Sequence, residues 1–233
     1  MRRSLAVVVL AMMVGCSGSE PADQTTWATA PLSQTQTAAL RDELLALKAD
    51  DQRYEQMVIQ QDPAIRDPGF YDEKARLQVA RADRCQEIFD AIGFPGHDLV
   101  GEQASHAFWL IVQHADHDPE FQDTVATAMT IAHQQGNADG KQLAYLTDRV
   151  RVNTDRPQLY GTQVQHDIET GKVSPRPLER PAEVDALRAE VGLEPLWSYM
   201  NGHCELFFAM NASVMAEHGV TEAHQYEVGF SDW

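Results

Sequence analysis

The chain has few cysteines, few basic residues and no long hydrophobic run. Its 233 residues contain three cysteines, and 18 lysines and arginines stand against 35 aspartates and glutamates, which gives a formal charge of -17. Because this charge repels phosphate backbones, we expect no nucleic-acid partner. No internal repeat is visible, which argues against a solenoid. The 43% hydrophobic content excludes a disordered chain and suffices for one ordinary domain with its own core.

Signatures of common hydrolases are also missing. The sequence has no Gly-x-Ser-x-Gly elbow and no His-Glu-x-x-His zinc motif. Neither Cys85 nor Cys204 stands in a recognisable catalytic context. The sequence therefore offers no obvious nucleophile, which weakens any assignment as an enzyme.

The N-terminus carries a targeting signal. Arg2 and Arg3 precede an apolar run over residues 5–14, followed by Gly15 and Cys16. A basic start and about 10 apolar residues make an export signal, which is too short for a membrane-spanning helix of about 20 residues. Residues 13–16 resemble the lipobox of bacterial lipoproteins. That resemblance implies a signal peptide over residues 1–15 and lipidation of Cys16 by palmitate-type acyl chains; the alternative is a plain secreted protein cut nearby.

Residues 16–37 predict a flexible tether behind the acylated cysteine, because Ser, Thr, Gln, Ala and Pro dominate them. We therefore expect the protein to be anchored to the bacterial cell envelope, with the membrane as its partner through the lipid on Cys16. Ser17 rather than Asp follows that cysteine. By resemblance to lipoproteins of two-membrane bacteria, this favours the outer membrane if the host has two membranes.

The two other cysteines leave two alternatives. An exported compartment is oxidising enough for Cys85 and Cys204 to form a disulfide. The other interpretation is two separate buried thiols, because Cys85 lies in a helical pattern beside Ile88 and Phe89.

Apolar residues at helical spacing dominate the rest of the chain and predict a mainly α fold. We expect a helical-hairpin domain of about six to seven helices with one small β-hairpin, in which residues 159–164 and 172–174 are the strands. The expected domain covers residues 38–200, and residues 201–233 form a C-terminal helical extension. The predicted helices cover residues 38–60, 72–92, 100–115, 119–135, 141–150, 182–191 and 196–219.

One polar group lies on the third predicted helix. Glu102, His106 and Gln113 fall on one face, because spacings of 4 and 11 residues are close to whole turns, and His117 joins them only if the helix continues that far. These side chains could bind a metal, form a metal-free polar site, or simply face solvent. We do not favour a metal, and we expect no cofactor.

A second polar group follows on the fifth predicted helix and the loop after it. Asp148 and Arg149 are adjacent, so on a helix they point apart and each needs another partner. Arg149 could pair with Asp116 or Glu102, or hold an anionic ligand. The alternative interpretation of this region is a buried hydrogen-bond network that fixes the predicted hairpin to the helices.

Several motifs in the same order carry a family resemblance. They are Leu99–Glu102, Trp109–Asp116, Asp118–Gln122, Leu143–Val150, Pro157–Gln163 and Val191–Leu196. Together they resemble the bacterial domain-of-unknown-function family 6624, over roughly residues 40–200. The resemblance implies no assigned activity. It does imply that one site contains Gln113, His114, Asp116, Asp148, Arg149, Gln158, Tyr160 and Gln163.

Two hypotheses for function follow. The first is a lipid-anchored envelope protein whose helical domain binds a small ligand or another envelope protein, with Gln113, Asp148, Gln158, Tyr160 and Gln163 as ligand-binding residues. The second is an envelope hydrolase, possibly metal-assisted, in which His114 is the general base, Asp116 orients it and Arg149 stabilises negative charge. Residues two apart on one helix diverge by about 200°, so Asp116 can orient His114 only if the helix ends between them.

Overall fold

The computed structural model describes residues 32–233. The signal peptide, Cys16 and most of the predicted tether lie outside this range. The described chain forms α1 (Gln34–Ile59), α2 (Phe70–Ile92), α3 (His97–Gln113), α4 (Pro119–Gln134), α5 (Gly140–Asn153), α6 (Val184–Glu190) and α7 (Leu196–Glu217). Short 3-10 helices cover Pro63–Arg66 and Pro181–Glu183, and strands β1 (Val164–Asp167) and β2 (Lys172–Pro175) pair antiparallel. The mainly α prediction with one small hairpin is confirmed.

Local sequence signals set most helix boundaries. Asp118 accepts a hydrogen bond from the backbone of Phe121 and precedes Pro119, so α4 begins as predicted. The first helix begins at Gln34 rather than residue 38, because Ser33 and Gln36 form a capping box. The last residues of the predicted tether are therefore helical.

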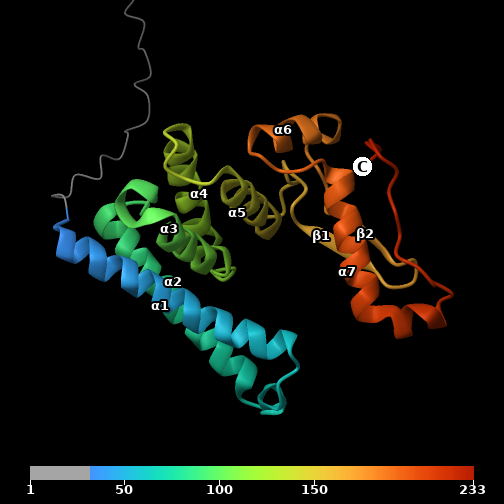
Figure 1. The fold of residues 1–233 in the computed structure, drawn as a ribbon, viewed down its shortest axis with the longest axis horizontal. Helices are drawn as coiled ribbons and strands as arrows, with labels where there is room; N and C mark the ends of the chain where they lie inside the picture. The colour runs from blue at the N-terminus through green and yellow to red at the C-terminus, as the bar shows by residue number, and fades with distance from the viewer. Residues whose placement is uncertain (1–31) are drawn as a thin grey trace, which may run out of the picture.

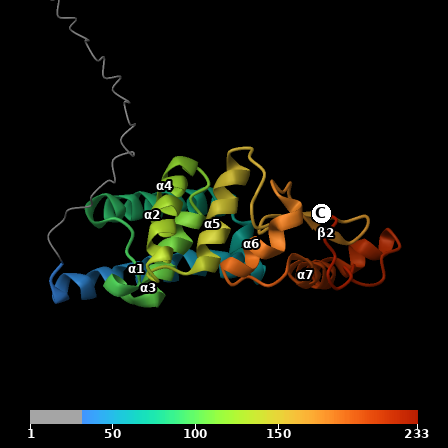
Figure 2. The ribbon, with the colours of Figure 1, turned by 90° about the horizontal axis from the view of Figure 1, so that it is seen from above.

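The helices pack around two separate hydrophobic clusters. Helices α1 to α5 surround the larger one, in which Leu44, Phe108 and Met129 are fully buried. The smaller one joins β2, α6, α7 and the C-terminal segment through Val173, Leu196 and Met200, among others. Figure 1 shows the two groups of elements side by side with α5 between them, and Figure 2 shows the same order from above.

The cysteines belong to different clusters. Cys85 is buried in the larger cluster and Cys204 in the smaller one, and both are free thiols. The proposed disulfide between them is therefore not formed, because each side chain packs within its own core. The second alternative, two separate buried thiols, describes the structure.

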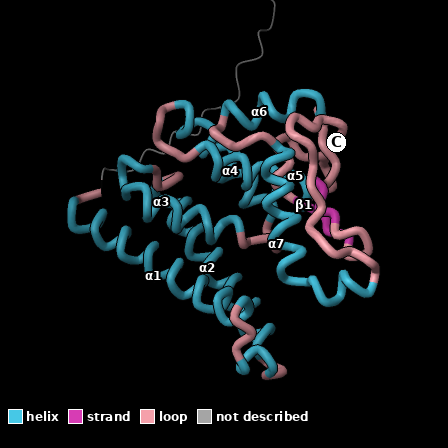
Figure 3. Tube along the Cα trace, turned by 45° about the vertical axis from the view of Figure 1, so that its right-hand side comes forward, coloured by secondary structure: helices cyan, strands magenta, loops and turns pink. Residues whose placement is uncertain are grey.

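The hairpin differs from the prediction in its first strand. That strand runs over Val164–Asp167 instead of residues 159–164. The backbone N–H groups of Leu159, Tyr160 and Thr162 bind the Asp148 carboxylate, so they are not free to pair with a strand. Figure 3 shows the two short strands in magenta beside α7.

The C-terminal part is only partly helical. Helix α7 crosses the predicted domain boundary at residue 200 and ends at Glu217, and the chain then continues without a further helix to Trp233. Tyr226 of this final segment is buried, and its hydroxyl donates to the carbonyl oxygen of Val173 at 2.8 Å. No helix in residues 32–233 is long and apolar enough to cross a membrane.

Candidate functional site

The three predicted catalytic residues line one pocket. Its volume is about 490 Å³, and α1, α2, the segment after α3, and α5 all contribute to it. His114, Asp116 and His117 come from the segment after α3, and Arg149 comes from α5. The remaining lining residues are Glu55, Lys74, Ala75, Gln78 and Val79.

His114 stands at the end of α3, where the regular helix stops at Gln113. The break lets its ring turn toward α1, and Nδ1 lies 2.9 Å from Oδ2 of Asp51. Asp51 is 2% exposed, whereas the His114 side chain is 24% exposed. The carboxylate that orients His114 is therefore Asp51 and not Asp116, which differs from the expected arrangement.

Electrostatics keep Asp51 ionised. Burial raises the pKa of this carboxyl, but the hydrogen bond and charge of His114 outweigh that effect. The pKa of Asp51 therefore lies below its usual value. An ionised carboxylate only accepts hydrogen bonds, so Nδ1 of His114 is the donor, and in the neutral form of the ring Nε2 carries the lone pair. His114 thus has the arrangement of an oriented general base.

Sequence reasoning missed Asp51. The residue lies two turns after Leu44 on α1, and both are fully or nearly fully buried. A carboxylate in phase with the core-facing positions of a helix needs a partner, because a buried unpaired charge is costly. That signal was present in the sequence, although it does not name the partner.

Asp116 pairs with Arg149. The guanidinium donates twice to the carboxylate, with Nε of Arg149 at 2.8 Å from Oδ1, and Asn153 donates to the same oxygen at 2.8 Å. Of the partners that the sequence left open for Arg149, the structure has Asp116. Burial raises the pKa of Asp116, but these donors outweigh it, and the pKa lies below the usual value.

A second ion pair completes the pocket wall. Nζ of Lys74 on α2 lies 2.8 Å from Oε1 of Glu55 on α1. The Lys74 and Glu55 side chains are 17% and 29% exposed, respectively. The pocket is therefore lined by cations and anions in pairs, and no single sign of charge dominates it.

The predicted ligand-binding residues of α5 and the following loop lie elsewhere. Asp148 is fully buried and accepts from the backbone of Leu159, Tyr160 and Thr162 and from the Thr162 hydroxyl, at 2.8 to 3.1 Å for the shorter contacts. Burial raises the pKa of Asp148 despite these donors. This arrangement corresponds to the alternative interpretation, a network that fixes the loop to the helices.

Gln158 strengthens the same network. Its amide nitrogen donates to the carbonyl oxygens of Gln163 at 2.9 Å and Arg176 at 2.8 Å, and its oxygen accepts from the backbone of Gln163 at 2.9 Å. The carbonyl oxygen of Tyr160 accepts from buried Arg188. Gln158, Tyr160 and Gln163 are thus brought together with Asp148, but they do not line the pocket of His114.

Gln113 lies next to the pocket but does not line it. Its backbone oxygen accepts from Nε2 of Gln122 at 3.2 Å, and its buried side-chain Oε1 has no hydrogen-bond partner. Gln122 also lies 3.3 Å from Nδ2 of Asn153. Gln113 therefore adjoins the groups that hold Asp116, without lining the pocket itself.

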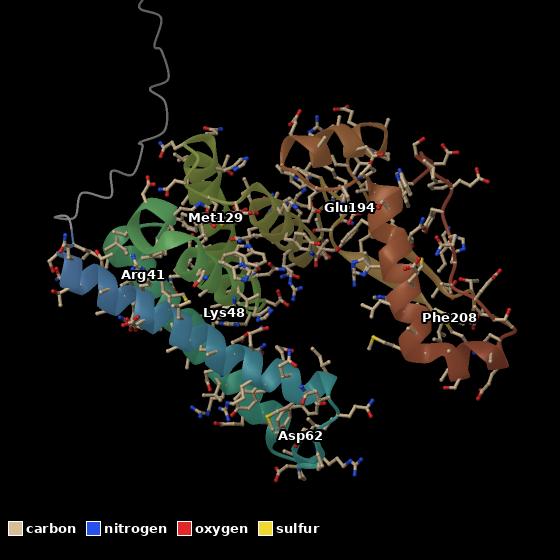
Figure 4. All side chains as sticks on the ribbon, viewed as in Figure 1. Arg41, Lys48, Asp62, Met129, Glu194 and Phe208 are labelled. Atoms are coloured by element: carbon tan, nitrogen blue, oxygen red, sulfur yellow. The ribbon has the colours of Figure 1, made fainter. Side chains whose placement is uncertain are left out.

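The polar face of α3 does not form one site. Glu102 and His106 line a second pocket of about 480 Å³ together with Lys48, which Figure 4 labels, whereas His117 lines the first. Gln113 lies about 16 Å along the helix from Glu102, because each residue rises 1.5 Å. Sharing a face is thus not enough to bring these groups to one metal ion.

The chain belongs to a family of unknown function (DUF6624), whose model matches residues 38–207. The match covers all seven helices except the first turn of α1 and the second half of α7. It confirms the family that the sequence motifs indicate. No curated protein and no solved structure shows significant similarity to the chain.

Proposed function

We propose that this protein is a lipid-anchored protein of the bacterial cell envelope whose helical domain binds a small polar ligand in the pocket of His114 and Arg149. The leader with Cys16 supports the anchor, and the pocket supports the ligand. The observation that carries the second part is the convergence of two ion pairs and the hydrogen-bonded His114–Asp51 pair, from four separate segments, on one open pocket.

The Arg149–Asp116 and His114–Asp51 pairs hold the pocket side chains in place before a ligand binds. Arg149 and His114 are held in place by Asp116 and Asp51, yet 30% and 24% of their side chains stay exposed. Holding such groups beforehand reduces the entropy that a ligand must lose when it binds. The pocket wall presents both hydrogen-bond donors and acceptors. A ligand that fits it therefore carries both kinds of group, as the sugar and peptide units of envelope polymers do.

Two experiments test the two parts. Incorporation of labelled palmitate into the full chain, lost in Cys16→Ser, tests the anchor; equal labelling of both would contradict it. Titration with soluble peptidoglycan fragments tests the pocket, with Arg149→Ala as the disrupting variant. Arg84→Ala is the matched control, because Arg84 is also an arginine paired with a carboxylate, Glu43, but lies outside this pocket. Binding that persists in Arg149→Ala, or is lost equally in both variants, would contradict the proposal.

The Asp51–His114 pair favours a hydrolase as the second candidate. His114 would take a proton from water through Nε2, and Asp51 would stabilise the resulting imidazolium. None of the residues that line the pocket carries a hydroxyl or thiol, so water is the nucleophile in this scheme. Arg149 would stabilise negative charge while shared with Asp116.

Hydrolysis of the same fragments by the full chain separates the two candidates. The hydrolase predicts product formation that His114→Gln abolishes and Arg84→Ala leaves unchanged. If the fragments bind but no product forms, the pocket binds its ligand without hydrolysing it, as the first candidate predicts.

A further inference from the structure

One wall of the pocket carries two carboxylates and an imidazole at close range. Asp51 and Glu55 are one turn apart on α1, and His114 reaches them from the end of α3. One ligand atom from each lies within 4.8 Å of the other two. We propose that Asp51, Glu55 and His114 bind a divalent transition-metal ion. The inference rests on the proposed function only in that the ion would face the same ligand pocket.

The donor set indicates the class of metal. One imidazole nitrogen and two carboxylate oxygens suit zinc, manganese, iron or cobalt, whereas magnesium and calcium prefer oxygen ligands alone. Metal–ligand bonds of about 2.0 to 2.2 Å place the ligand atoms of one ion about 3 to 3.5 Å apart. Nδ1 of His114 and Oδ2 of Asp51 are 2.9 Å apart, already close to this spacing. The ion would take the place of the proton that Nδ1 donates to Asp51, and that proton would pass to solvent. Glu55 would supply the third ligand atom after a rotation of its side chain.

Positive charge already surrounds this group. Lys74 places its ammonium 2.8 Å from Glu55, and the pocket gives the lysine side chain room to withdraw. Arg81 has a side chain that is 5% exposed, and its Nη1 lies 3.7 Å from Oδ1 of Asp51 without a hydrogen-bond partner. Arg81 faces Oδ1 of Asp51, so Oδ2, the oxygen beside His114, is the one left for the ion.

Three protein ligands leave a coordination position open. Catalytic zinc sites share this pattern, with water or substrate in the remaining position. Asp116, His117 and Arg149 line the same pocket, so a ligand held there could reach the ion. The metal ion would therefore bind one end of the molecule held in the pocket.

Calorimetric titration of chelator-treated, tag-free full chain with Zn²⁺ and with Mn²⁺ tests the inference. We expect one equivalent of at least one ion to bind. Glu55→Gln should weaken binding by at least the roughly 10- to 100-fold that loss of a group supporting a metal ligand costs. Lys74→Met should strengthen binding, because the competing ammonium is gone.

Glu43→Gln is the matched control, because Glu43 also lies on α1 and pairs with a cation of α2, Arg84. Its metal affinity should equal that of the unchanged protein. No binding by the unchanged protein, equal affinity of Glu55→Gln and Glu43→Gln, or no effect of Lys74→Met would overturn the site. Circular dichroism checks that each variant folds, and fragment titrations run in chelator separate failure of the metal site from failure of the pocket.

Discussion

Nδ1 of His114 lies 2.9 Å from Oδ2 of Asp51, although 63 residues separate them in the chain. This contact ties the end of α3 to the middle of α1 beside the pocket. It also fixes which ring nitrogen of His114 donates. The pair therefore links the stability of the helical domain to the chemistry of the candidate site.

Asp51→Asn should destabilise the domain. The substitution keeps the shape but removes the charge that faces His114 and buried Arg81. We expect a loss on the order of 1–3 kcal/mol in the free energy of unfolding, measured by urea denaturation. Glu43→Gln removes a partly exposed ion pair and should cost less than about 1 kcal/mol. Equal losses in the two variants would show that the buried Asp51–His114 pair stabilises the domain no more than a partly exposed ion pair does.

Asp148→Asn should loosen the loop after α5. Four donor groups converge on the two carboxylate oxygens, whereas an amide has one oxygen and would turn its own donors toward them. We expect a loss on the order of 3 kcal/mol and faster hydrogen exchange at the amides of Tyr160 and Thr162. Exchange as slow as in the unchanged protein would mean that the loop is held by other contacts.

The buried thiols should be unreactive in the folded protein. Burial raises the pKa of Cys85 to about 12, and burial also raises the pKa of Cys204. Thiolate is the reactive form, so both thiols should react slowly with a disulfide reagent at pH 8. In a Cys16→Ser chain under denaturant without reductant, both should react at once. If neither reacts until a reductant is added, a disulfide joins them after all.

Acidification should weaken the domain through His106. Burial and the charge of Lys48 lower the pKa of His106, whose Nδ1 accepts from the Gln142 amide at 3.1 Å. The folded protein then binds fewer protons than the unfolded chain. The contribution to stability is therefore complete above the ordinary imidazole pKa of about 6.5, and it is lost as the pH falls from there through the lowered pKa of the folded state.

Urea unfolding at pH 7 and pH 5 measures this loss. His106→Gln should show a smaller loss between the two pH values than the unchanged protein. His218→Gln is the control, because His218 is exposed just after α7. A loss in His106→Gln as large as in the control would assign the acid sensitivity to other groups.

The sequence predicted the parts of this fold that depend on local signals. The apolar spacing of the helices and the cap at Asp118 are local signals. For Arg149 the sequence showed only that a partner was needed and left Asp116, Glu102 and an anionic ligand open; the structure has Asp116. The contact between Asp51 and His114 depends on how α1 packs against α3, which no spacing within either helix reveals. For the same reason the sequence misplaced β1, because Asp148 binds the N–H groups that a strand would have used.

The central claim is that the pocket of His114 and Arg149 binds a polar ligand. The most direct measurement follows the imidazole resonances of His114 by NMR while soluble peptidoglycan fragments are added to the full chain. The account predicts saturable shifts of these resonances that are absent in Arg149→Ala and retained in Arg84→Ala. Resonances that stay unchanged at millimolar fragment, or shifts that are equal in the two variants, would contradict it.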